Sequence, residues 1–149
     1  MSVTATQRNA TNNQSTVDFV RENIFIFGNR FQTGTFINDS GAEATFTAGS
    51  LVLRDTTTAN QIKPAVAGAT LANVIGILAT DGTIVLADDG TIEDANYCIK
   101  GDIDASLLQL PATVTLDTVP TGSAKNLRDI LTDLGFVLFN VVENSKTEI

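Results

Sequence analysis

Residues 73–92, NVIGILATDGTIVLADDGTI, decide the fold class. An apolar run broken by Gly76 comes first, and two Asp-Gly pairs follow eight residues apart, at Asp81-Gly82 and Asp89-Gly90. Each pair precedes Thr-Ile, and short β-prone runs separated by such turns are typical of a barrel or a sandwich. Because Gly76 weakens a strand and adds no chemistry, we expect it to admit a large side chain from a neighbouring strand or from a closing helix.

Towards the C-terminus, one segment has the periodicity of a helix. Its apolar residues recur at i, i+3, i+4 and i+7, namely Leu127, Ile130, Leu131 and Leu134. Ser123 is a plausible N-cap and Gly135 stands at the C-cap position, so the pattern predicts a helix over residues 124–134. The β-prone segment 136–142 is then expected to return into the sheet as a strand.

Towards the N-terminus, residues 1–20 are rich in Thr, Asn, Gln and Ser and have no apolar periodicity. This composition predicts a flexible arm. Residues 21–48 are aromatic and β-branched, which indicates a β-rich extension or hairpin with a turn at Gly28-Asn29. Residues 49–149 form the expected core domain. The expected fold class is mostly β (α+β), a small barrel-like domain with one helix near the C-terminus.

The amino-acid composition and net charge exclude several classes of function. Seventeen acidic and nine basic residues give a net charge of −8, which argues against direct binding of nucleic acid. There is no apolar run of about 18 residues and no basic, apolar N-terminus, so neither a membrane span nor a secretory signal is expected. The absence of histidine removes Ser-His-Asp catalysis and most zinc sites. Cys98, the single cysteine, is interpreted as a buried structural thiol made in a reducing compartment.

A group of acids follows the apolar run, consisting of Asp81, Asp88, Asp89, Glu93 and Asp94. Their order does not match a calcium-binding EF-hand loop, and we interpret them as solvated turn acids. A carboxylate pair for glycoside hydrolysis would need aromatic platforms, whereas the chain has no tryptophan and one tyrosine. The sequence therefore predicts no catalytic residue, no cofactor-binding residue and no metal ligand.

The order of segments over residues 49–142 is informative as a whole. A strand end, a polar loop, a second strand and a later apolar strand follow one another at residues 51–55, 56–60, 61–66 and 74–79. A strand with a polar turn comes next, GTIEDANYCIKGDID, and the chain then closes with SAKNLRDILTDLGFVLFNVV. This arrangement resembles the head decoration proteins of lambda-like tailed bacteriophages.

The resemblance implies a small α+β domain that assembles as a homotrimer on the outer surface of an expanded phage capsid. There it bridges copies of the major capsid protein and resists the pressure of packaged DNA, without catalysis or a cofactor. Such a protein is made in the bacterial cytoplasm and resides in the virion. The resemblance also implies that the N-terminal arm adds an edge strand to the capsid protein. The expected arm contacts are Val3, Thr4, Ala5, Thr6, Val17 and Phe19.

Two alternatives remain open. A binding module, such as a fibre base or a glycan-binding surface domain, would expose aromatic residues on one face. The candidates are Phe25, Phe27, Phe31 and Phe36, most of which we expect to be buried or at a subunit contact. An enzyme using paired carboxylates, with Asp88 and Asp89 as the candidate pair, is the other alternative.

Overall fold

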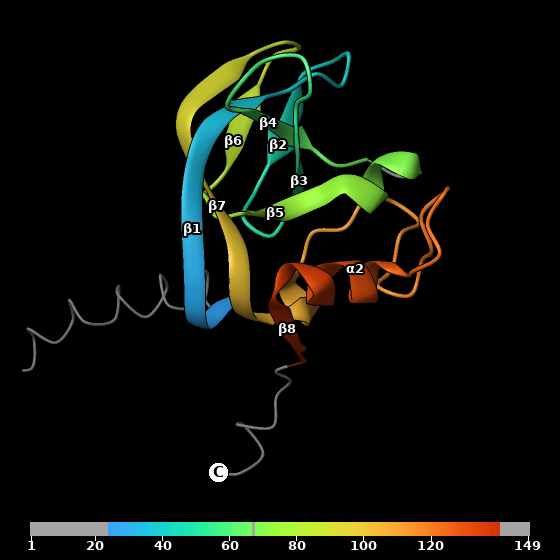
Figure 1. Cartoon of the computed structure of the whole chain (residues 1–149). Helices are drawn as coiled ribbons and strands as arrows, with labels where there is room; N and C mark the ends of the chain where they lie inside the picture. Colours follow the sequence, from blue (N-terminus) through green and yellow to red (C-terminus); the bar gives the residue numbers. More distant parts are fainter. Residues whose placement is uncertain (1–23, 67, 141–149) are drawn as a thin grey trace, which may run out of the picture.

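The computed structural model describes residues 24–66 and 68–140 (Figure 1). The strands of this part of the chain are β1 (Phe25–Ile37), β2 (Ala44–Phe46), β3 (Leu51–Arg54), β4 (Gln61–Pro64), β5 (Val74–Leu78), β6 (Ile84–Leu86), β7 (Thr91–Asp104) and β8 (Phe136–Phe139). The helical elements are the α-helix α2 (Leu127–Leu134) and two short 3-10 helices, η1 (Ala69–Asn73) and η2 (Ala105–Leu107). The expected arm, residues 1–20, and its six contact residues lie outside the described part.

Five strands close into a barrel. The main sheet has the order β1-β4-β3-β5-β7-β8, and β1 also pairs with β7. In Figure 1, β1 and β7 run side by side as long curved strands, with α2 and β8 below the barrel. Strands β2 and β6 form a separate two-stranded ribbon. The structure therefore confirms the predicted mostly β fold, with a barrel and one α-helix near the C-terminus.

Two apolar clusters hold the fold together. The first contains residues from all five barrel strands, namely Phe36, Val52, Ile62, Leu78, Ala95 and Tyr97, together with Phe46 from β2. The second packs α2 against the outside of the barrel and includes Ile77, Cys98, Ile103, Leu127, Leu131 and Phe136. Adjacent residues such as Ile77 and Leu78 belong to different clusters, because successive side chains of a strand point to opposite faces.

Helix α2 begins three residues later than the sequence predicted. Its N-cap is Asn126, whose side-chain oxygen accepts a hydrogen bond from the N–H of Asp129 at 2.9 Å. Ser123 instead closes a local turn, in which its hydroxyl accepts a hydrogen bond from the N–H of Lys125. The prediction of Ser123 as the N-cap is therefore wrong, because Asn caps a helix as well as Ser does and Asn126 is the one in position.

The rest of the predicted helix pattern is confirmed. Leu127 and Leu131 are fully buried, while Ile130 and Leu134 on the same stripe are half-buried. Gly135 is the C-cap and has the left-handed conformation that favours glycine, with φ 111° and ψ 11°. The chain then turns directly into β8, which pairs in parallel with the end of β7.

Gly76 lies at an irregularity in β5. Val52 of β3 is opposite Gly76 and Leu53 is opposite Val74, so Ile75 is an extra residue in β5, as in a β-bulge. A Cβ atom on Gly76 would lie 2.4 Å from the carbonyl oxygen of Cys98 and 3.1 Å from the ring of Tyr97. The close neighbour is therefore β7 rather than the helix, and its backbone approaches even more closely than its side chains.

Strand β1 belongs to the barrel rather than to a separate hairpin. It pairs with β4 at Thr35 and Phe36, and with β7 along most of its length. The expected turn at Gly28-Asn29 is instead a bulge within β1, because the pairing jumps from Phe27 to Arg30 at that point. Whether residues 21–48 are an addition to a core that begins at residue 49 stays a prediction.

Candidate interaction surface

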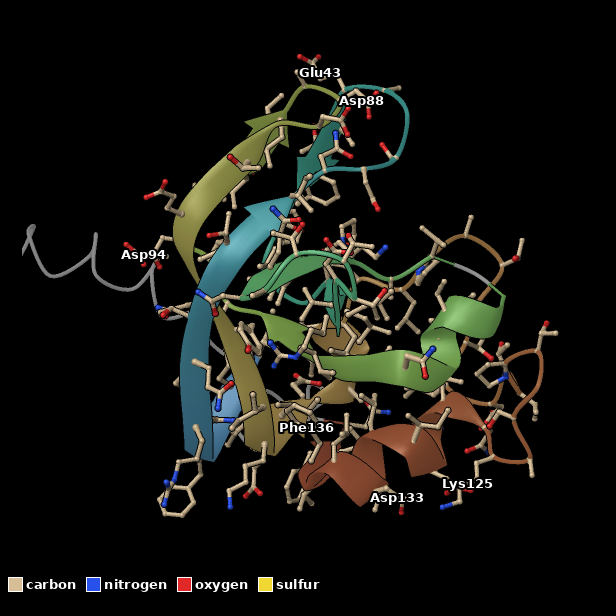
Figure 2. All side chains as sticks on the ribbon, turned by 45° about the horizontal axis from the view of Figure 1, so that its top comes forward. Glu43, Asp88, Asp94, Lys125, Asp133 and Phe136 are labelled. Atoms are coloured by element: carbon tan, nitrogen blue, oxygen red, sulfur yellow. The ribbon has the colours of Figure 1, made fainter. Side chains whose placement is uncertain are left out.

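Of the acids singled out in the sequence, Asp81, Asp88 and Asp89 lie in turns, but Glu93 and Asp94 lie on β7, so their interpretation as turn acids is wrong. Figure 2 shows Glu43 and Asp88 at one end of the molecule, with Lys125, which precedes α2, and Asp133 of α2 at the other. The Asp88 carboxylate accepts a hydrogen bond from the N–H of Gly41 at 2.9 Å, which ties together the two loops at that end. Across the described residues, no group of three or more His, Cys, Asp or Glu side chains is placed to hold a metal ion.

Asp55 organises the loop between β3 and β4. Desolvation acts to raise the pKa of this carboxyl, but hydrogen bonds from Thr57 and the charge of Lys63 outweigh it and hold the pKa below its ordinary value. Lys63 lies 3.9 Å from Asp55 and 3.3 Å from Asp39. Both ion pairs are partly exposed, and solvent weakens such pairs, so we assign them a local structural role.

Cys98 is fully buried in the cluster beneath α2. Burial raises the pKa of its thiol, which opposes formation of the reactive thiolate. Its Sγ contacts the backbone oxygen of Lys100 at 3.2 Å, and the Asn29 amide donates to Sγ at 3.7 Å. The interaction with Lys100 is therefore through the main chain, and the position of Cys98 agrees with a structural thiol.

A groove of about 810 Å³ runs beside the first half of β1. Residues 24–29 and Phe31 of the β1 segment line it, and the turn at residues 79–83 lines it as well. The rings of Phe25 and Phe31 meet edge to face with centroids 5.5 Å apart. Phe27 is 75% exposed, which is unusual for a phenylalanine in a chain with a well-formed core.

The four phenylalanines therefore differ in burial. Phe36 is fully buried and Phe25 is half-buried, whereas Phe27 and Phe31 are exposed in the single chain. The sequence did not separate these pairs, because all four lie in one aromatic, β-prone segment. Whether Phe27 and Phe31 lie at a subunit contact stays a prediction.

A second apolar surface is found on β8. Val137 is 50% exposed and Phe139 is 45% exposed, while Phe136 between α2 and the barrel is buried. Strands β8 and β1 lie on the two sides of the last residues of β7, since Asp102 pairs with Val137 and also with Phe27. We use the name β1/β8 apolar surface for the exposed large apolar side chains of these two strands, which are Ile26, Phe27, Phe31, Val137 and Phe139.

The charge near this surface differs from that of the whole chain. Arg30 of β1 is paired in register with Lys100 of β7. Neither cation forms a salt bridge with any residue that the structure describes. This apolar surface therefore lies beside two cations in a protein that is strongly acidic overall.

Neither a protein-family model nor a curated protein matches this chain. Within the described ranges, no helix is both long enough and apolar enough to cross a membrane.

Proposed function

We propose that this protein is a capsid decoration protein. It binds as a homotrimer to the outside of an expanded phage head, contacts the major capsid protein, and stabilises the shell against the pressure of packaged DNA. It catalyses no reaction and needs no cofactor, nucleic acid or membrane. It is made in the bacterial cytoplasm and works in the virion.

The β1/β8 apolar surface is the observation that carries this proposal. A soluble monomer rarely exposes several large apolar side chains on two strands that flank a third, and such a patch commonly marks a protein–protein contact. In a trimer the patch is covered by other copies, which accounts for the exposure of Phe27, Phe31 and Phe139 in a chain whose other described aromatic residues are buried or half-buried. The order of segments over residues 49–142 supplies the likeness to decoration proteins.

The arm, residues 1–20, binds the trimer to the shell. Residues 1–23 are attached to Ile24, which lines the groove beside β1. An extended arm that pairs with a sheet edge gains main-chain hydrogen bonds. Ordering it opposes binding by about 1–2 kcal/mol per residue, so one arm binds modestly. Three arms on one trimer bind together, which raises the overall affinity by about 10²–10⁴-fold.

The test is co-sedimentation of the purified protein with empty shells before and after expansion. We expect binding to expanded shells alone, and we expect deletion of residues 2–20 to abolish it while the oligomer stays intact. Equal binding to both kinds of shell, or unchanged binding after the deletion, would contradict the proposal.

A glycan-binding surface module is the second candidate, and the exposure of Phe27 and Phe31 favours it. Carbohydrate sites combine an aromatic platform with side-chain amides, and Asn29, Asn96 and Gln109 line the same groove. A double variant, Phe27→Ser with Phe31→Ser, separates the two candidates. A subunit contact predicts loss of the trimer, whereas a glycan site predicts an intact trimer that no longer binds a hit from a glycan array.

A further inference from the structure

The end of β7 carries a small three-stranded region with two open edges. Gly101–Asp104 of β7 pair with β8 on one side, and Lys100–Ile103 pair with the first part of β1 on the other. Strand β1 meets β4 only at Thr35 and Phe36. Among the described strands, the outer edge of β8 and the outer edge of the first half of β1 therefore have no partner, and they face in opposite directions.

The composition of β8 gives its edge no protection. Natural proteins blunt an exposed edge strand with charged residues, proline or a bulge, because an unpaired edge can pair with another chain. Strand β8 reads Phe-Val-Leu-Phe and has none of these features. Val137 and Phe139 are the two residues of β8 that face away from the core, and both are about half exposed. This edge is suited to being covered in the working protein.

The distribution of charged residues favours a second copy of the chain as the partner. Two copies with a net charge of −8 repel one another, so they should meet where acidic residues are fewest. Strand β8 carries no charge, and the first half of β1 carries only Arg30, opposite Lys100. Asp102 is the one acid paired with both strands, and it is half-buried.

We infer that the open edge of β8 docks against the first half of β1 in a second copy, with Val137 and Phe139 packed on Phe27 and Phe31. The two edges differ, so the contact is head-to-tail, and such contacts close into a ring when the rotation allows. This inference rests on the proposed trimer and names the two surfaces that would join its subunits.

The first test blocks β8 with charge. In the variant Val137→Lys with Phe139→Lys, the new lysines would face Arg30 and Lys100 of the next copy. Val85→Lys is the matched control, because Val85 is 57% exposed on a strand of the other ribbon. By analytical ultracentrifugation we expect a trimer for the parent and for the control. For the β8 variant we expect a folded monomer, with self-association at least about 100-fold weaker.

The second test uses the head-to-tail geometry. The β8 variant keeps its β1 surface, and the double variant Phe27→Ser with Phe31→Ser keeps its β8 edge. Each alone should be monomeric, but an equimolar mixture should form dimers, because one intact contact is possible between the two. Absence of any mixed dimer, with both variants folded by circular dichroism, would overturn the inference.

A third measurement needs no variant. Hydrogen exchange at the amides of residues 136–139 should slow markedly when the parent protein is concentrated from monomer to trimer. Equal exchange in both states would overturn the proposed contact. A parent trimer that survives the β8 substitutions would also overturn it while leaving the proposed function intact. A monomeric parent that ignores expanded shells would overturn both.

Discussion

Replacing Gly76 with alanine should destabilise the barrel by steric conflict alone. The new Cβ would lie 2.4 Å from the carbonyl oxygen of Cys98 and 3.1 Å from the Tyr97 ring. Relief of the first contact requires β5 and β7 to separate by close to 1 Å at the bulge, since ordinary contacts of a Cβ atom begin at 3.4 Å. Overpacking a well-packed site costs about 1–3 kcal/mol and occasionally more.

Gly34 provides a matched control. It is also a buried strand glycine, but a Cβ there would lie 3.2 Å from the backbone oxygen of Asn60, a contact that a small shift relieves. Reduced freedom of the unfolded chain favours alanine at both sites by about 0.4–1 kcal/mol. We therefore expect a net loss of about 2 kcal/mol for Gly76→Ala and less than about 0.5 kcal/mol for Gly34→Ala.

Urea unfolding followed by circular dichroism measures both variants. A loss of about 2 kcal/mol corresponds to a fall in Tm of about 8 °C for a domain of this size. If Gly76→Ala unfolds at the parent's urea midpoint, or if Gly34→Ala loses more stability than Gly76→Ala, the close approach of β7 is not what requires glycine.

Asn126→Ala should lower the free energy of unfolding in urea by about 1 kcal/mol, because it removes the N-cap of α2. Ser123→Ala should lower it by less than about 0.5 kcal/mol. The reverse order would show that Ser123 is the N-cap. The Cys98 thiol should react with a disulfide reagent at least about 100-fold more slowly in the native protein than in urea. The reason is that the thiol is buried and its pKa is raised in the folded chain. Comparable rates in the two conditions would show that the thiol is accessible. The pKa of Asp55 is lowered on folding, so its contribution to stability is present above the unfolded-state value of about 4 and is lost as the pH falls through the folded-state value. Below about pH 4, Asp55→Asn should therefore lose less stability than the parent, and parallel losses would contradict this. Replacing Asp88 and Asp89 together with Asn should leave shell binding unchanged in co-sedimentation, whereas its loss would give these carboxylates a functional role.

Local patterns in the sequence predicted the features that depend on neighbouring residues. The Asp-Gly turns, the buried stripe of Leu127 and Leu131 and the C-cap at Gly135 each follow from a few adjacent positions. The start of α2 was misplaced because two good capping residues, Ser123 and Asn126, lie within one turn of each other, and only the course of the preceding loop decides between them.

Local sequence patterns could not predict the features that depend on strands far apart in the chain. The pairing of β1 with β7 places Phe25 opposite Ile103, and the sequence of neither strand indicates which strand it pairs with. The bulge at Gly28 follows from that pairing, and the irregularity at Gly76 follows from the pairing of β3 with β5, so the sequence showed the glycines without their neighbours. The exposure of Phe27 and Phe31 likewise depends on which faces of β1 other elements cover. The β1/β8 apolar surface could therefore be recognised only in the folded chain.

The stability of DNA-filled heads tests the proposed role most directly. Heads that lack this protein would be heated with a DNA-binding dye, with and without purified protein added back. We expect the added protein to raise the temperature of DNA release, and the Val137→Lys, Phe139→Lys variant to raise it much less than the Val85→Lys control. An unchanged release temperature at saturating parent protein would contradict a role in stabilising the shell.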